Sequence, residues 1–250
     1  MASPLHTRSW GGGELCILLL HGITSSGEGW WRLGPDLAER GWNVTAADLR
    51  GHGRSPGGDD FMLSSYAADV LALGIGWDAV LGHSLGGALA VLASFAEQGF
   101  SRRLILQDPA LLMAAVPIDE AVHWLLESYR RPLTVEAVAE ESPAWHLEDV
   151  RLKVEALEQC SPTVVEATVR DNPDWNLIAE TAGLAVPTTV IGGDPEHGGI
   201  VPVTIGEWFA SANPFIEYVM IEGSGHSAHR ESDSYDEYLG IVLNAVEAAI

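Results

Sequence analysis

A serine flanked by glycines is the strongest chemical signal in this sequence of 250 residues. The segment Gly82-His83-Ser84-Leu85-Gly86 has the pattern Gly-x-Ser-x-Gly. This pattern can place a serine hydroxyl on a sharp turn between a strand and a helix, where glycine neighbours relieve the crowding of a strained backbone. Ser84 is therefore a candidate nucleophile if a strand precedes it and a helix follows it.

The residues on both sides of Ser84 predict that arrangement. The apolar stretch 77–81 is typical of a buried strand, and the stretch 87–96 of small and apolar residues is typical of a helix. The first turn of such a helix directs free N–H groups and the positive end of its dipole toward the serine. The context favours a catalytic turn over an ordinary glycine-rich loop.

A serine hydroxyl needs a base to take its proton, and the chain has nine histidines. His226 ends the segment Gly223-Ser224-Gly225-His226, directly after the strand pattern at 215–221. Ligands of open α/β sheets bind at the carboxyl ends of the strands, so this position favours His226 as the base. His229, three residues later, is the alternative.

The third group must be a carboxylate that orients the imidazole and stabilises its charged form. Two aspartates directly follow strand patterns and precede a proline. Asp108 follows the stretch 103–107, and Asp194 follows the strand pattern that begins at Val186. The residues alone leave both aspartates open.

Three further segments, together with the serine turn, resemble landmarks of the α/β-hydrolase superfamily. They are Leu18-Leu19-Leu20-His21-Gly22, Asp48-Leu49-Arg50-Gly51-His52-Gly53-Arg54-Ser55 and Gly223-Ser224-Gly225-His226. The resemblance covers nearly the whole chain. It implies a triad of Ser84, Asp194 and His226, with Asp108 as the alternative acid.

The same resemblance implies an oxyanion hole made of two backbone N–H groups. One belongs to Leu85, the residue after the nucleophile, and the other to Ile23, just after His21-Gly22. The implied reaction is acyl transfer through an acyl-enzyme on Ser84. No metal-ligand spacing and no phosphate-binding glycine motif occurs, so we expect neither a metal nor another cofactor.

The elements that position these residues alternate between strand and helix. Strand patterns lie at 15–20, 42–48, 77–81, 103–107, 186–191 and 215–221, with helical patterns between most of them. This rhythm predicts a mostly parallel central sheet flanked by helices, as in the α/β-hydrolase fold. Only helical patterns occupy 113–182. We therefore expect a core of 1–112 and 183–250 and a helical cap of 113–182 that is not an independent domain.

The predicted cap is rich in apolar and aromatic residues, among them Trp124 and Trp145. They indicate an apolar pocket for a small or medium apolar ester or lactone. The resemblance adds the possibility of an acyl-homoserine lactone, since capped members of this superfamily include lactonases that act on such compounds. Relatives with this fold also include carbon–carbon bond hydrolases, perhydrolases and other cofactor-free enzymes. Some are ligand receptors with slow hydrolysis. These alternatives stay open.

The formal net charge of −22 is the most unusual feature of the composition. Such an acidic surface repels nucleic acid and anionic membranes, and it disfavours strongly anionic substrates unless the pocket is shielded. No targeting or membrane-spanning pattern is visible, so we expect a cytoplasmic protein that acts on a small molecule. The sequence contains no motif that predicts an oligomeric state.

Overall fold

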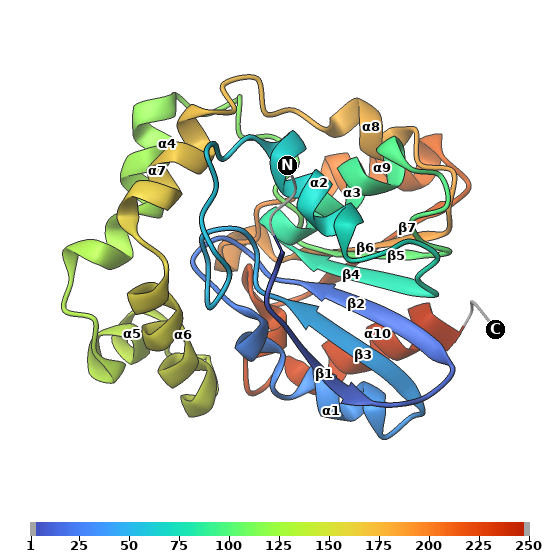
Figure 1. The fold of residues 1–250 in the computed structure, drawn as a ribbon, viewed down its shortest axis with the longest axis horizontal. Coiled ribbons are helices and arrows are strands. Elements are labelled where there is room, and N and C mark those ends of the chain that lie inside the picture. The colour runs from blue at the N-terminus through green and yellow to red at the C-terminus, as the bar shows by residue number, and fades with distance from the viewer. Residues whose placement is uncertain (1–3, 248–250) are drawn as a thin grey trace.

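Seven strands form one sheet at the centre of the structure, a computed structural model that describes residues 4–247 (Figure 1). They are β1 (Thr7–Gly11), β2 (Leu15–Leu20), β3 (Trp42–Ala47), β4 (Ala79–His83), β5 (Leu104–Gln107), β6 (Thr188–Gly193) and β7 (Ile216–Ile221). Their order is β1-β3-β2-β4-β5-β6-β7, and only β1 pairs antiparallel. The sheet confirms the predicted fold class.

The strand β1 is the one element of the sheet that the sequence patterns did not predict. Its residues alternate between exposed and half-buried, so it lacks the continuous apolar run of a central strand. It pairs with the edge of β3, from Thr7 opposite Ala47 to Gly11 opposite Asn43. A short edge strand of this kind is defined by its neighbour more than by its own composition.

Helices cover both faces of the sheet. On one face lie α2 (Leu63–Ala72), α3 (Leu85–Ala96), α8 (Ile178–Ala182) and α9 (Val203–Ala212), and on the other lie α1 (Leu33–Ala38) and α10 (Tyr235–Glu247), as Figure 1 shows. Three 3-10 helices join them: η1 (Gly27–Trp30), η3 (Pro195–His197) and η4 (Ala228–Arg230). The sheet is therefore buried between two helical layers.

The strand β2 shows why the core has two halves. Leu18 and Leu20 pack into the cluster under α2 and α3, whereas Ile17 and Leu19 pack into the cluster over α1 and α10. Successive side chains of a strand point to opposite faces, so a strand covered on both faces is apolar throughout. Because both faces of β2 are covered by helices, its residues 15–20 form an unbroken apolar run in the sequence.

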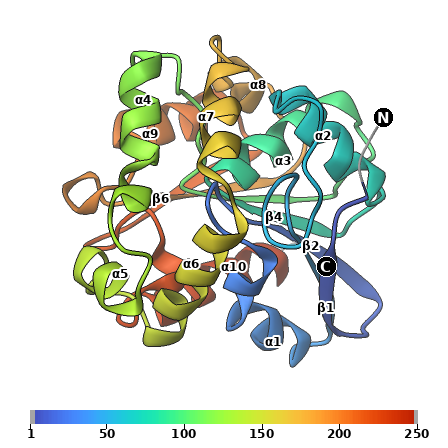
Figure 2. The ribbon, with the colours of Figure 1, turned by 60° about the vertical axis from the view of Figure 1, so that its left-hand side comes forward.

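Between β5 and β6 the chain leaves the sheet and forms a group of helices. They are α4 (Ile118–Leu125), η2 (Glu127–Arg130), α5 (Val135–Glu141), α6 (Leu147–Gln159) and α7 (Pro162–Arg170), followed by α8. The helices α4 to α7, which we call the inserted helices, lie beside the carboxyl ends of the parallel strands (Figures 1 and 2). That edge is where the predicted site residues lie.

The inserted segment leaves and re-enters the core at one place. The N–H of Leu177 donates to the carbonyl of Leu111 at 2.8 Å, and Leu112 pairs with Asn176. The helix α8 then packs on α3. Residues 178–182, which we expected in the cap, therefore lie on the core.

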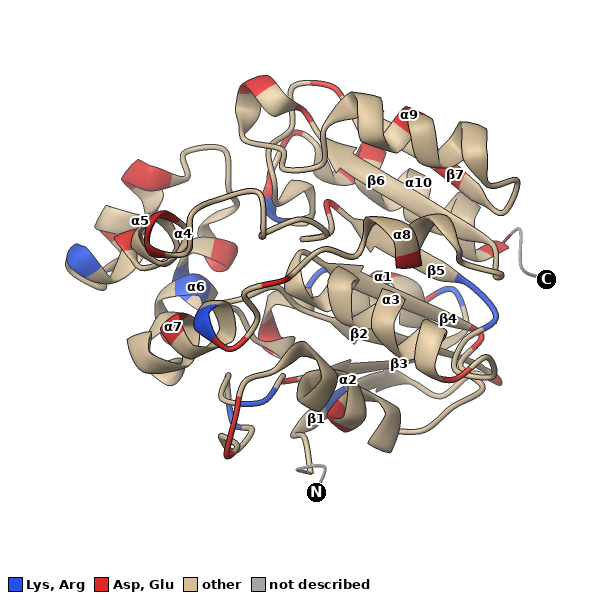
Figure 3. Ribbon diagram, turned by 90° about the horizontal axis from the view of Figure 1, so that it is seen from above, with Lys and Arg blue, Asp and Glu red and all other residues tan. Residues whose placement is uncertain are grey.

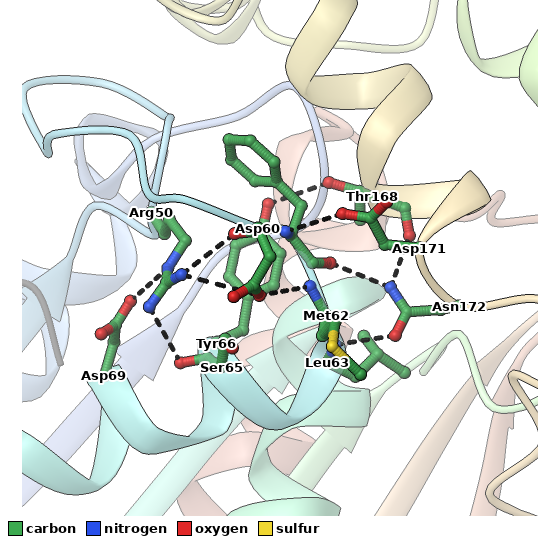
Figure 4. Close-up of polar contacts among 11 residues, drawn as sticks. Arg50, Asp60, Met62, Leu63, Ser65, Tyr66, Asp69, Thr168, Asp171 and Asn172 are labelled. Carbon is green, nitrogen blue, oxygen red and sulfur yellow. Dashed lines mark hydrogen bonds and ion pairs between the residues drawn. The ribbon is translucent and has the colours of Figure 1, made fainter. Parts of the chain in front are cut away.

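A polar network joins α7 to the start of α2 (Figure 4). Asn172, just after α7, accepts from the N–H of Leu63 at 2.8 Å and donates to the carbonyl of Phe61 at 2.9 Å. The hydroxyls of Tyr66 and Thr168 lie 2.9 Å apart inside the same contact. These buried and half-buried bonds hold one end of the inserted helices against the core.

Acidic residues are spread over most of the ribbon, and basic residues are few (Figure 3). The inserted helices carry both signs, with ion pairs such as those of Arg170 with Glu166 and Asp119. Exposed pairs of this type contribute little to stability. No helix within residues 4–247 is both long enough and apolar enough to span a membrane.

Candidate active site

Ser84 lies on a sharp turn between β4 and α3, as the sequence predicts. Its backbone angles are φ 52° and ψ −116°, a region that costs a non-glycine residue about 1–3 kcal/mol. The turn is held by the N–H of Ser84, which donates to Gln107 at 3.0 Å, and by its carbonyl, which accepts from Ala88 and Ala110. Neighbouring strands and the helix thus stabilise the strained residue.

The two glycines of the motif are required by close backbone approach. A Cβ atom added to Gly82 would overlap the carbonyl of Gly86, and one added to Gly86 would overlap the carbonyl of Leu20. Neither glycine has a positive φ, so space and not dihedral freedom explains both. The sequence motif is a packing requirement of this turn.

The partly exposed His226, which lines the same cavity as Ser84, pairs with the buried Asp108. The Nδ1 atom of His226 lies 2.6 Å from Oδ2 of Asp108, whose side chain is 1% exposed. Asp108 also accepts hydrogen bonds from the N–H groups of Gly193, Ile200 and Val201 at 2.9–3.3 Å. These three donors fix the Asp108 carboxylate in direction. With Oδ2 as the acceptor for Nδ1 of His226, the Nε2 atom is the ring nitrogen available to accept a proton.

Asp194, the acid that the resemblance favours, does not contact His226. The Asp194 carboxylate accepts from the N–H groups of Gly223 and Glu196, both at 2.9 Å, and lies 3.3 Å from His197. The hydrogen bonds of Gly223 and Glu196 lower the pKa of Asp194. It is a turn residue that caps η3, and Asp108, the alternative, is the residue in contact with His226.

His229, the alternative base, is buried among other groups. Its Nδ1 lies 2.8 Å from Nε2 of Gln107, and its Nε2 accepts from Nε of Arg230 at 3.2 Å. Burial and then the Arg230 charge lower the pKa of His229 well below its usual range. Both ring nitrogens are engaged, and His229 does not line the cavity described below.

The two predicted oxyanion donors lie at the same cavity. Ile23 and Leu85 both line it, and within residues 4–247 the N–H of neither donates to a protein acceptor. His21 fixes the loop that carries Ile23, because its Nε2 accepts from the N–H of Leu49 at 2.9 Å while Nδ1 donates to the carbonyl of Gly22 at 2.7 Å. Free N–H groups facing a cavity can stabilise an oxyanion.

A cavity of about 260 Å³ joins these groups to the inserted helices. Ser84 and His226 lie on its wall, and so do Trp124 and Trp145, as we expected of a pocket. Trp124 is 56% exposed and therefore lies toward the rim. No group of three or more His, Cys, Asp or Glu side chains suited to a metal occurs within the described residues.

Two basic residues on the cavity wall were missed from the sequence: Lys153 of α6 and Arg230 at the end of η4. Nζ of Lys153 donates to Oγ1 and to the carbonyl of Thr24 at 2.5 and 3.0 Å. Burial and then the Arg230 charge lower the pKa of Lys153 to about 7. Lys153 is the only lysine of the chain, and this was the one feature of the sequence that could have drawn attention to it.

The sequence pattern described as the Alpha/beta hydrolase family matches residues 17–239 of this chain. The chain belongs to the α/β hydrolase family. The match includes the turn of Ser84 and the segments that carry Asp108 and His226, and it confirms the resemblance stated above. As a member of this hydrolase family the chain is an enzyme at that general level.

Individual relatives differ in activity. Lipase LipV of Mycobacterium tuberculosis is 34% identical over 151 residues, which are 58% of this chain and 57% of the lipase. The match therefore spans little more than half of that relative. A crystal structure of an N-formylmaleamic acid deformylase from Pseudomonas putida S16 has a TM-score of 0.82 and 26% identity, covering 96% of each chain. An esterase structure from Exiguobacterium antarcticum has a TM-score of 0.79 at 17% identity, covering 97% of this chain and 95% of the esterase, and shows the shared fold alone.

Proposed function

We propose that this α/β hydrolase is a serine hydrolase that cleaves a carboxylic ester through an acyl-enzyme on Ser84. The observation that carries the proposal is the 2.6 Å contact between the buried Asp108 and His226, which lines the same cavity as Ser84. The similarity to a lipase favours an ester as the bond that is cleaved. A lactone, including an acyl-homoserine lactone, is the cyclic form of the same bond.

In the proposed first step His226 takes the hydroxyl proton of Ser84 on Nε2 while Oγ bonds to the carbonyl carbon. The carbonyl electron pair moves to oxygen, which the N–H groups of Ile23 and Leu85 would stabilise. When the tetrahedral intermediate collapses, the proton passes from His226 to the departing alkoxide. The acyl group stays on Ser84.

The second half repeats these steps with water. His226 takes a proton from the water, the hydroxide oxygen bonds to the acyl carbon, and the collapse returns the proton to Ser84. In both halves the imidazole carries a positive charge for a moment. The Asp108 carboxylate, fixed by the three backbone N–H groups, would stabilise that charge and keep the ring in place.

We also propose that the inserted helices form a cap that shapes the cavity. They contribute Trp124, Leu125, Val138, Trp145 and Lys153 to its wall, whereas the core contributes the reacting groups. A wall of large apolar side chains excludes water and binds the carbon skeleton of a substrate. Substrate choice would then depend on α4 to α7.

A second candidate is hydrolysis of an N-acyl amide. The structural relative whose match covers 96% of both chains is an N-formylmaleamic acid deformylase. The same three residues would act, with the amide nitrogen as the leaving group that takes the proton from His226, so that a primary amide is released. Assays of an N-formyl amide beside an ester and a lactone of equal size would separate the three bond types.

Labelling with a fluorophosphonate probe, located by mass spectrometry, tests the nucleophile. We expect a single adduct on Ser84 in the folded protein and none on Ser84→Ala, because only an activated serine attacks the probe. Ser142→Ala is the matched control, since Ser142 lines the same cavity and should not affect labelling. An unlabelled Ser84 in folded protein would contradict the proposed function.

Turnover separates an enzyme from a ligand receptor with slow hydrolysis. With 4-nitrophenyl acetate in large excess, we expect release of many equivalents of 4-nitrophenol per protein chain. Release that stops after one equivalent would indicate a receptor. Faster cleavage of simple esters than of every lactone tried would exclude lactone specificity.

A further inference from the structure

The cavity wall carries two positive charges although the protein as a whole has a net charge of −22. Lys153 comes from α6 and Arg230 from the end of η4, so two distant parts of the chain bring cations to one space. Arg230 is 4% exposed. Charges that are largely shielded from water are nearly always paired in proteins, so the groups that contact these two cations indicate what the cavity can bind.

Neither cation has a carboxylate partner within residues 4–247. Arg230 donates from Nη2 to Ser25 at 2.6 Å and from Nε to His229, and its guanidinium lies 4.6 Å from the Trp145 ring. Its Nη1 has no acceptor in the described part of the chain. The buried carboxylate of Asp149 makes its ion pair with Arg32 at 3.5 Å and does not line the cavity, but it also acts on Arg230 electrostatically: burial lowers the pKa of the Arg230 guanidinium, and the Asp149 charge raises it.

Lys153 is in a similar position. It donates two hydrogen bonds to Thr24, and an ammonium group has three N–H donors, so one donor remains. The one acidic residue lining the cavity within the described structure is Glu141, which is exposed at the end of α5. The cavity therefore offers at least one free donor on each of two cations and little negative charge to neutralise them.

We propose that the substrate carries a carboxylate, separate from the bond that is cleaved, and that Lys153 and Arg230 bind it together. This inference rests on the proposed function, because it places the anion in the cavity that Ser84 lines. A carboxylate supplies two acceptor oxygens, one for each cation, and charge-assisted hydrogen bonds of this kind are the strong ones. The apolar side chains of Met113, Leu125 and Val138 on the same wall fit a hydrocarbon chain between the two functional groups.

The proposal changes the expectation drawn from composition. A net charge of −22 opposes the approach of an anion, but surface charges act weakly beyond about 8–10 Å in physiological salt. The buried Arg230 and the half-buried Lys153 act on a ligand in the cavity at contact distance and in a lower dielectric. The local pair therefore determines the sign of the ligand charge.

The test compares half-esters with neutral esters of the same shape. Monomethyl succinate, glutarate and adipate are paired with methyl 4-methylpentanoate, 5-methylhexanoate and 6-methylheptanoate, in which an isopropyl group replaces the carboxylate. Methanol release gives kcat/KM for each. We expect at least one half-ester to exceed its isostere by about 10- to 100-fold, the range for hydrogen bonds to charged groups. Neutral esters that equal or exceed all three half-esters would overturn the proposal.

Variants assign the preference to the cations. Lys153→Met should lower the ratio of kcat/KM for the half-ester to that for its isostere by about tenfold. Arg151→Met is the matched control, because Arg151 lies on the same helix, pairs with Glu148 and does not line the cavity. An equal fall for both substrates in Lys153→Met would overturn the proposal and assign Lys153 to support of the Thr24 loop.

The preference should also depend on pH. Lys153 has a pKa of about 7, set by burial and Arg230 and opposed by Cys160 and Glu141, so it is charged below pH 7 and neutral above. The KM of the half-ester relative to its isostere should therefore rise between pH 6 and 8.5. The ratio cancels any effect of pH that acts on both substrates alike. A flat ratio would remove Lys153 from the proposed site.

Two further measurements separate this inference from the proposed function. If neither ester type is cleaved, the rate of fluorophosphonate labelling at Ser84 still reports binding, because a half-ester in the cavity should slow it more than its isostere. If Ser84 is not labelled, the proposed function fails, and calorimetric titration with glutarate decides whether the anion site exists. Labelling without any preference for half-esters leaves the serine hydrolase intact and overturns the carboxylate site.

Discussion

Asp108→Asn is expected to lower kcat for ester hydrolysis by about 10⁴-fold, the loss found when the acid of a serine triad becomes an amide. The amide would offer His226 an N–H or a neutral oxygen in place of a carboxylate oxygen 2.6 Å from Nδ1. The imidazole would then adopt its other tautomer, or its charged form would lack the negative charge that stabilises it. Rates with 4-nitrophenyl acetate, together with KM, measure the effect.

Asp194→Asn is the matched control for this prediction. Asp194 also follows a strand and precedes a proline, but its oxygens accept from Gly223 and Glu196 and not from His226. We expect kcat to change by less than about fivefold, because an asparagine oxygen can still accept at such a cap. A larger loss in Asp194→Asn than in Asp108→Asn would assign the triad to Asp194.

Gly86→Ala is expected to lower the free energy of unfolding by about 3 kcal/mol, at the upper end of the usual cost of overpacking. The added methyl group would overlap the carbonyl of Leu20 at the end of β2, and a backbone atom cannot move aside as a flexible side chain can. Any shift of α3 that relieves the overlap also displaces Ser84. Urea unfolding measures the change in stability, and ester hydrolysis should fall with it.

Gly240→Ala gives the opposite expected sign for the same substitution. Gly240 lies inside α10, and a Cβ added there meets no atom within 4 Å. Replacing glycine by alanine in a helix interior stabilises it by about 1 kcal/mol. If Gly86→Ala proved as stable as the wild type, close packing at the turn could not be the reason for this glycine.

The position of Ser84 and the fold could be predicted from the sequence because local patterns determine both. The apolar run of β2, the glycines around Ser84 and the alternation of strands with helices each occupy a few consecutive residues. A turn that tolerates no Cβ, and a strand buried on both faces, leave a direct trace in residue type. These features predicted the parallel sheet and the place of Ser84, and the edge strand β1 was missed because it is half exposed.

Which carboxylate contacts His226, and which charges line the cavity, were decided only by the tertiary structure. Asp108 and Asp194 have the same local context, and what separates them is the segment from Gly193 to Val201, which folds back and surrounds Asp108 with N–H groups. Lys153 meets Thr24 across 129 positions of sequence. Contacts between distant segments depend on how whole elements pack, and spacing along the chain does not record them. The sequence by itself determined that a serine is poised at the end of a strand, whereas the packing of the elements determined which carboxylate lies against its histidine and which cations face it.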